Sequence, residues 1–228
     1  MRVLERVLRR LIGWLAVASL GLAGAVWADT REELFKAASM DAESVIVGMA
    51  LKGLNLNTVD EEGRSALLIA ATENSLKVAR FLLEQPQTKV GIRNAQGESP
   101  LMMAAIKGHL EMVRLLIDHK AEVNKPGWTP LHYASANPEA SSTAIVALLL
   151  EKYAYIDAES PNKTTPLMMA ARYGHADAVK LLLQEGADAS LRNQQGMTAV
   201  DFARSIERED IARQIESFGP VVPATGKW

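Results

Sequence analysis

Apolar positions recur along the chain in blocks whose starts lie 34, 30, 36 and 33 residues apart. Each block opens with Ser or Thr, continues with Pro or Ala and then Leu or Val, and most soon reach two adjacent small residues. A hydroxyl side chain caps the free amides of a helix's first turn, and Pro fits the first helical position because its missing N–H would have no partner there. The pattern therefore predicts regularly spaced helix starts. The openings are Ser65-Ala66-Leu67, Ser99-Pro100-Leu101, Thr129-Pro130-Leu131, Thr165-Pro166-Leu167 and Thr198-Ala199-Val200.

A second apolar segment follows the first in the middle blocks, as in Leu115-Leu116 and Leu181-Leu182-Leu183. Gly108, Gly174 and Asn74 stand between the two segments, where a residue in the left-handed conformation commonly ends a helix. A period of about 33 residues is typical of stacked helix pairs that share one core. Such chains usually bind partners on a long open surface.

Two blocks carry the most complete pattern. One runs Ser99-Pro100-Leu101-Met102-Met103-Ala104-Ala105, then Gly108-His109 and Leu115-Leu116-Ile117, and the block from Thr165 to Asp188 has the same order. This order resembles the ankyrin repeat, and the likeness covers roughly residues 31–218. The resemblance implies an all-α ankyrin-repeat solenoid of about five to six helix pairs with short β-hairpin loops, used for protein binding. The domain would span residues 29–218, with approximate repeats at 31–60, 61–94, 95–124, 125–159, 160–193 and 194–218.

The chain also departs from the family pattern. The family's motif histidine is present at His132, whereas Met102 and Met168 replace it in other copies and exchange a polar contact for a flexible apolar one. Helical spacing predicts that one Met of each Met-Met pair is buried and the other partly exposed. Lys120 and Tyr153 stand where the family has Gly, so strained turns are expected there.

The copy of residues 125–159 is the most irregular. The step from Ile117 to Gly127 is 10 residues, whereas the equivalent step from Leu183 to Gly196 is 13, so the loop at 124–127 is predicted to be short. Residues 137–142 conversely lengthen the connection between the two helices of this copy. Irregular positions in a repeat array are candidate functional positions. Neutral variation in surface loops is the alternative.

The first 28 residues have the pattern of a secretory signal peptide. Arginines precede an apolar run from residue 11 to 26, and small residues at the end of the run predict cleavage between Ala28 and Asp29. This pattern predicts a periplasmic protein. The alternative is an uncleaved helix that anchors the chain in the inner membrane, since the apolar stretch approaches the length needed to span a bilayer. Residues 219–228 are expected to form an extended C-terminal tail.

Charge and cysteine content agree with export. The chain has 25 basic and 27 acidic residues, and residues 1–28 contain four Arg and one Glu, so the mature part carries 21 basic and 26 acidic residues and a net charge of −5. We therefore expect no binding to nucleic acid, and none to membranes once the signal is removed. The chain has no Cys, which suits an oxidising compartment. Nothing in the sequence indicates self-association, so a monomer is expected.

Catalytic and cofactor motifs are missing from the sequence. The four histidines, His109, His119, His132 and His175, lie in separate parts of the repeat pattern without the close spacing of a metal site. No Ser stands in a Gly-x-Ser-x-Gly context, and the glycines follow the repeat spacing instead of forming a phosphate-binding run. We expect no cofactor, no metal and no enzymatic activity.

The resemblance places a partner on the concave face, which the projecting loops and the exposed positions of the first helices line. Trp, Tyr and Arg are frequent anchors of interfaces, so Trp128, Arg172 and Tyr173 together with Ile106 form the predicted central patch. In the alternative, Trp128 folds back onto its own shortened loop. The complete predicted set is Arg64, Glu98, Ile106, Lys107, Trp128, Arg172 and Tyr173.

These observations favour an exported, non-enzymatic adaptor or scaffold that binds a protein partner in the periplasm or cell envelope. The alternative is an exported small-molecule-binding protein or enzyme with a site near Trp128 and Tyr173. An effector that acts on proteins of another cell would use the same binding chemistry. The fold alone does not choose among them, because one fold serves many functions.

Overall fold

The computed structural model describes residues 30–218. The predicted signal peptide, its cleavage position at Ala28 and Asp29, and the predicted tail at 219–228 lie outside the described residues. Between residues 30 and 218, no helix is both long enough and apolar enough to cross a membrane.

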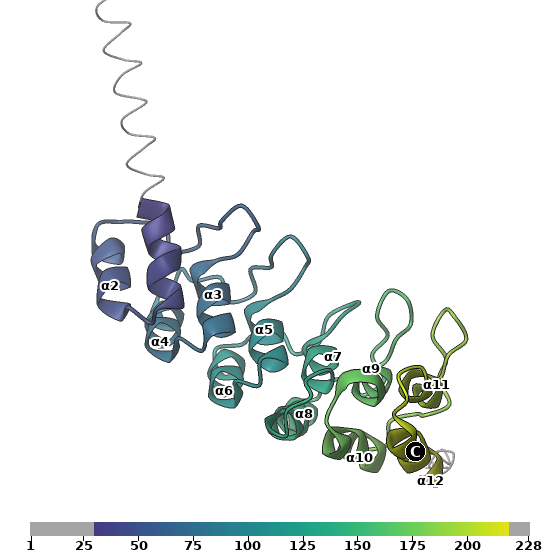
Figure 1. Ribbon diagram of the computed structural model, residues 1–228. Helices are drawn as coiled ribbons and strands as arrows, with labels where there is room; N and C mark the ends of the chain where they lie inside the picture. The colour runs from purple at the N-terminus through teal and green to yellow at the C-terminus, as the bar shows by residue number, and fades with distance from the viewer. Residues whose placement is uncertain (1–29, 219–228) are drawn as a thin grey trace, which may run out of the picture.

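Two parallel rows of helices build the described chain (Figure 1). The first helices of successive pairs contact one another along one row, and the second helices contact one another along the other. Residues 30–39 are helical and pair with α2, which gives six helix pairs within residues 30–218. The all-α ankyrin-type solenoid predicted from the sequence is confirmed.

The projecting loops lead into the first helix of each pair, and a short connection joins that helix to the second. The first helices are α3 (Ala66–Glu73), α5 (Pro100–Ile106), α7 (Pro130–Ser135), α9 (Pro166–Tyr173) and α11 (Ala199–Arg204). The second helices are α2 (Glu43–Leu51), α4 (Leu76–Glu84), α6 (Leu110–Asp118), α8 (Ser141–Glu151), α10 (Ala176–Gln184) and α12 (Glu209–Ser217).

Helix starts follow the hydroxyl residues as predicted. The Ser65 side chain accepts a hydrogen bond from the Leu68 amide at 3.2 Å, and Thr198 accepts one from the Asp201 amide at 3.3 Å. These bonds satisfy amides that have no carbonyl partner inside the helix. The prolines at 100, 130 and 166 each occupy the first turn of their helix.

Small residues let the first helices pack closely against their neighbours. Both members of the pairs Ala70-Ala71, Ala104-Ala105 and Ala170-Ala171 are fully buried. Larger apolar side chains such as Leu116 and Leu149 fill the space between the rows and are also fully buried. Burial of one such side chain contributes about 1.5–3 kcal/mol. The core is therefore one continuous layer along the stack.

The predicted division of the methionine pairs is confirmed. Met102 and Met168 are buried, whereas Met103 and Met169 are half-buried. The exchange of histidine for methionine does not, however, abolish the polar contact. The sulfur of Met102 accepts the Ser99 amide at 3.3 Å, as the Nδ1 atom of His132 accepts the amide of its own capping residue at 3.2 Å. Met therefore reproduces one hydrogen bond of the family's histidine.

Helix ends agree with the prediction at two of three positions. Asn74 and Gly108 are left-handed, with φ of 59° and 76°. The prediction is wrong for Gly174, whose φ is −78° and ψ is 174°. A Cβ atom on Gly174 would lie 2.2 Å from the carbonyl oxygen of Ser135, so this glycine is needed for a close approach of backbone between two repeats.

The turns at Lys120 and Tyr153 are left-handed as predicted, with φ of 66° and 61°. Gly186 holds the same place in a later copy, with φ of 94°. Tyr153 is 84% exposed, so its side chain has little packing to lose. Replacing it with glycine is expected to raise the free energy of unfolding by about 1 kcal/mol, because glycine adopts the left-handed conformation without strain. Thermal unfolding followed by circular dichroism should show a melting temperature higher by about 2–4 °C.

Gly186→Ala is the matched control and should lower the melting temperature by a similar amount, since it places a Cβ atom on a left-handed residue with open space around it. A Tyr153→Gly variant that melts below the native chain would show that the exposed ring stabilises the fold and that backbone strain is the smaller effect.

The projecting loops turn back on themselves through single backbone hydrogen bonds. The Asp60 amide donates to the Arg64 carbonyl, and the Asn193 amide donates to the Met197 carbonyl, both at 3.0 Å. In the part of the chain that the structure describes, the one isolated β-bridge joins Val59 and Ser65. The loops are thus hairpin-shaped turns without extended strands.

Candidate functional site

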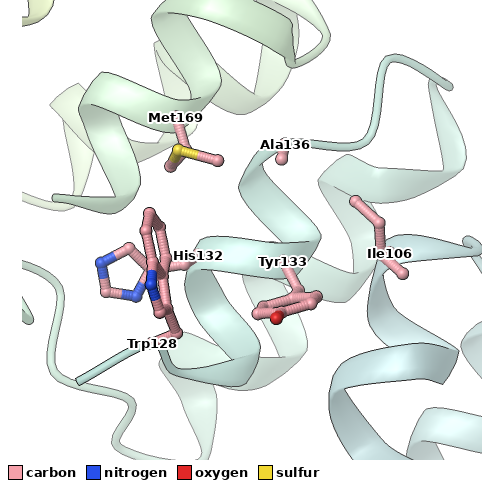
Figure 2. A pocket seen from close by; sticks show the side chains of 6 residues that line it. All are labelled: Ile106, Trp128, His132, Tyr133, Ala136 and Met169. Atoms are coloured by element: carbon pink, nitrogen blue, oxygen red, sulfur yellow. The ribbon is translucent and has the colours of Figure 1, made fainter. Parts of the chain in front are cut away.

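An apolar cavity of about 250 Å³ lies in the middle of the face formed by the projecting loops and the first helices, here called the inner face. Three consecutive first helices contribute to it: α5 through Ile106, α7 through Tyr133 and Ala136, and α9 through Met169. Figure 2 shows these side chains around one shared space. Trp128, which precedes α7, and His132 complete the lining.

The Trp128 ring packs against the first turn of its own helix. Its centroid lies 5.2 Å from that of the His132 ring, and the two planes meet at 73°, which is an edge-on arrangement. Trp128 is half-buried and also lines the central cavity. The side chain therefore packs against the first turn of α7 and also lines the cavity.

His132 is a fully buried, neutral residue of the core. Its Nδ1 atom accepts the Thr129 amide at 3.2 Å, so the proton resides on Nε2, which donates to the Thr164 carbonyl at 2.9 Å. Burial, with a smaller contribution from the charge of Lys125, lowers the pKa of His132 to about 4. The histidine thus links two repeats through its hydrogen bond to Thr164 and packs against the Trp128 ring.

Tyr133 and Glu98 form a polar rim at the cavity. The Tyr133 hydroxyl donates to Glu98 Oε1 at 3.0 Å, and Asn94 Nδ2 donates to Glu98 Oε2 at 2.6 Å. Burial and the hydrogen bond to the carboxylate raise the pKa of Tyr133 above its ordinary value. The ring is therefore held in a fixed orientation by a hydrogen bond across two repeats.

The shortened loop lacks the backbone hydrogen bond that links other neighbouring projecting loops. The Ala95 amide in the second projecting loop donates to the Glu62 carbonyl in the first loop at 2.8 Å. The Gln194 amide in the last loop donates to the Asn162 carbonyl in the loop before it at 2.9 Å. Among the described residues, 125–128 form no backbone hydrogen bond to either neighbouring loop. The short loop at 124–127 thus lacks these backbone links, although Gly127 lies beside Pro161 of the following loop.

The side chain of Asn124 closes the base of the short loop. It donates to the Tyr153 carbonyl at 2.7 Å and accepts the Tyr155 amide at 2.9 Å. Asn57 makes the equivalent pair of bonds in the first loop, to Gln87 and Lys89. The hydrogen bonds at the base of the short loop thus match those of the first loop, and the three missing residues come from its projecting part.

The structure brings together some of the sequence-predicted site residues and separates others. Ile106 and Trp128 share the cavity, and Glu98 lies at its rim through Tyr133. Arg172 stacks over the Tyr173 ring at 5.3 Å, on the helix that carries Met169. Lys107 is exposed directly after Ile106.

Arg64 lies apart from the cavity. It pairs with Asp60 at 2.7 Å and Glu62 at 3.2 Å, and it lines a separate hollow near the N-terminal end of the described stack, together with Glu32 and Glu73. Most of the charged residues that line that hollow are acidic. Arg64 is consequently not part of the central patch.

Sequence reasoning missed Tyr133, His132 and Met169 as cavity residues. Tyr133 and Ala136 are three residues apart on α7, a spacing that places side chains on one helix face. Ile106 and Ala136 occupy equivalent positions, seven residues after their capping residues, in adjacent copies. Aligning the copies and marking equivalent positions could have found this set.

The cavity offers apolar contact and little chemistry. Its titratable members are a histidine held neutral and a tyrosine whose ionisation is disfavoured. Within residues 30–218, no group of three or more His, Cys, Asp or Glu side chains is placed to hold a metal ion. The arrangement is suited to accept an apolar side chain.

Comparison with known proteins agrees with this architecture. Family models match residues 62–95 as an ankyrin repeat, 87–160 as ankyrin repeats (3 copies) and 149–203 as ankyrin repeats (many copies). The fold is that of a helical repeat solenoid, and the chain belongs to the ankyrin-repeat family. Ankyrin repeats are protein-interaction modules, and the fold itself is not catalytic.

Relatives share the repeats within much longer chains. The chain is 29% identical over 187 residues to the nuclear factor NF-kappa-B p105 subunit of Gallus gallus, an alignment that covers 79% of this chain and 18% of the relative. It is 37% identical over 94 residues to ankyrin repeat and SAM domain-containing protein 6 of Mus musculus, covering 41% and 10%. The chain therefore spans between a tenth and a fifth of the length of these relatives.

One solved structure matches most of the chain. A chain in the complex of the Bd0816 predatory endopeptidase from Bdellovibrio bacteriovorus with immunity protein Bd3460 superimposes with a TM-score of 0.68 and 27% identity. The match covers 81% of this chain and 96% of that chain.

Proposed function

We propose that this protein is an exported adaptor that binds a protein partner in the periplasm or cell envelope through its inner face. The observation that carries the proposal is the apolar cavity of about 250 Å³ beside Trp128 on the inner face. Aromatic and apolar pockets of this kind hold the anchor side chains of interfaces. The family's role in protein binding supports the same function.

The size of the cavity favours a single side chain over a free small molecule. Pockets for small molecules usually enclose about 300–1,000 Å³, and this one holds about 250 Å³. The inserted loop at 137–142 contributes none of the lining residues, so it does not close the cavity into a deeper site. A side chain from a partner would need only part of such a volume.

The N-terminal pattern supports export. Basic residues, an apolar run and a small-residue cleavage signal precede the repeats, and the absence of Cys suits an oxidising compartment. In this proposal the signal is removed before the repeats fold outside the cytoplasm.

A second candidate function is inhibition of an exported peptidase. The likeness to a chain from a complex between an endopeptidase and an immunity protein favours it, because the match spans most of both chains. The two candidates share one binding surface and differ in the consequence for the partner. A captured peptidase whose activity falls on addition of this chain would favour inhibition over scaffolding.

Replacing Trp128 with alanine is expected to weaken partner binding about 30-fold, which corresponds to about 2 kcal/mol, because the ring forms one wall of the cavity. The partner is first captured by crosslinking from the envelope fraction of the source cell, with the chain from residue 29 onward as bait. The purified partner is then titrated against the native and substituted chains by calorimetry.

Tyr155→Ala is the control, since Tyr155 is 69% exposed and lies outside the cavity, and it should bind with the native affinity. Thermal melting of both variants checks the fold. Unchanged affinity for Trp128→Ala, with normal affinity for the control, would place the partner elsewhere on the molecule.

A further inference from the structure

Arg172 occupies the inner face one helical turn beyond the cavity. It follows Met169 by three residues on α9, and residues at that spacing are neighbours on one side of a helix. Met169 lines the cavity. Arg172 therefore borders the turn of α9 that lines the cavity, and its guanidinium group reaches the Ser205 hydroxyl in the next repeat.

The guanidinium is held in place but is not neutralised. Its Nη1 atom donates to Ser205 Oγ at 3.1 Å, and its carbon lies 5.3 Å from the centroid of the Tyr173 ring. The Nε atom is buried without a hydrogen-bond partner. A neutral hydroxyl and an aromatic face thus orient the group while most of its donors stay unused.

Four of the other arginines in the described chain have acidic partners, and the remaining ones form no ion pair. Arg64, Arg80, Arg93 and Arg204 each form at least one ion pair. Within residues 30–218, Arg172 forms none, although it is half-buried. An oriented, uncompensated guanidinium is complementary to a carboxylate, which it binds through two parallel N–H donors.

We propose that the partner presents one segment in which an apolar side chain fills the cavity at Trp128 and a neighbouring Asp or Glu pairs with Arg172. This inference rests on the proposed function and adds the chemistry of the partner. The apolar side chain contributes buried area to the interface. The carboxylate fixes the orientation of the bound segment, because an ion pair at one place disfavours other registers of the segment on the inner face. A segment lacking the carboxylate would leave Arg172 without a charge partner.

The test uses a random linear peptide library displayed on phage. It is selected in parallel on the chain from residue 29 onward and on three variants. Arg172→Gln removes the charge and keeps most of the side chain. Ala136→Phe fills the cavity. Lys180→Gln is the control, since it removes an exposed cation of α10 in the row of second helices, away from the inner face.

Peptides enriched on the native chain should share an apolar residue close to Asp or Glu. Selection on Arg172→Gln should retain the apolar residue and lose the acidic one, whereas selection on Ala136→Phe should lose the whole pattern. Selection on Lys180→Gln should match the native chain. A synthetic peptide of the enriched sequence should bind Arg172→Gln at least about tenfold more weakly by fluorescence anisotropy.

Two results would overturn the inference in different ways. Acidic residues that persist on Arg172→Gln would refute the role of Arg172 while the cavity remains a docking site. Peptides that bind Ala136→Phe as well as the native chain, or a native chain that enriches no peptide, would refute docking in the cavity and with it the proposed function. Circular dichroism melts of the three variants confirm that each is folded.

Discussion

Replacing Gly174 with alanine is expected to lower the free energy of unfolding by about 3 kcal/mol or more. A Cβ atom there would stand 2.2 Å from the Ser135 carbonyl oxygen and 2.8 Å from the Ala170 Cα. Both neighbours are backbone atoms of α7 and α9, so no side-chain rotation can relieve the overlap. The two repeats would have to separate at their tightest contact, and urea denaturation followed by circular dichroism measures the loss.

Gly48→Ala is the matched control for this substitution. Gly48 lies inside α2, and a Cβ atom on it would meet nothing within 4 Å. Alanine has the higher helix propensity, so this variant should gain up to about 1 kcal/mol. If Gly174→Ala were as stable as the native chain, α7 and α9 would pack with more freedom than the structure indicates.

The same glycine shows what sequence reasoning could and could not reach. Helix starts were predictable because a capping hydroxyl and a proline act within one turn of chain, as at Ser99 and Pro100. Asn74 was predictable for a similar local reason. Gly174 stands in the same sequence context as Gly108, yet its requirement comes from a carbonyl in the preceding repeat, which no local pattern reports.

The candidate site also has a part that sequence reasoning could predict and a part that it could not. Ile106 and Trp128 could be chosen from the resemblance, because the repeat assigns exposed positions to one face. The cavity itself depends on how three repeats pack together, and Tyr133 joins it through a hydrogen bond to Glu98 in the previous repeat. The short loop at 124–127 was predicted from spacing alone, since a deletion is visible in the count of residues.

Lowering the pH from 7.5 to 4 is expected to remove about 3 kcal/mol of stability through His132 alone. Burial holds the pKa of this histidine at about 4 in the folded chain, against an ordinary value of 6.5. Between these two values the unfolded chain binds a proton at His132, whereas the imidazole of the folded chain stays neutral. The stabilisation is complete above pH 6.5 and declines as the pH falls toward 4, at 1.36 kcal/mol per unit of pKa difference.

His132→Met isolates this contribution, because methionine already occupies the equivalent positions 102 and 168. There the sulfur accepts the same capping amide at 3.3 Å and 3.4 Å. At pH 7.5 the variant should be less stable by about 1 kcal/mol, since the hydrogen bond to the Thr164 carbonyl is lost. That carbonyl still accepts the Ser160 amide at 3.0 Å, so it is not left unsatisfied.

At pH 4 the order should reverse, with His132→Met the more stable chain by about 2 kcal/mol, because the variant has no group to protonate at this position. Urea denaturation of both chains at several pH values between 7.5 and 4 measures the difference. Taking the difference cancels the carboxylates that titrate in the same range, among them Asp157, whose pKa burial raises. Two stability curves that stay parallel across this range would mean that His132 is protonated in the folded chain, and hence that water or an anion reaches it.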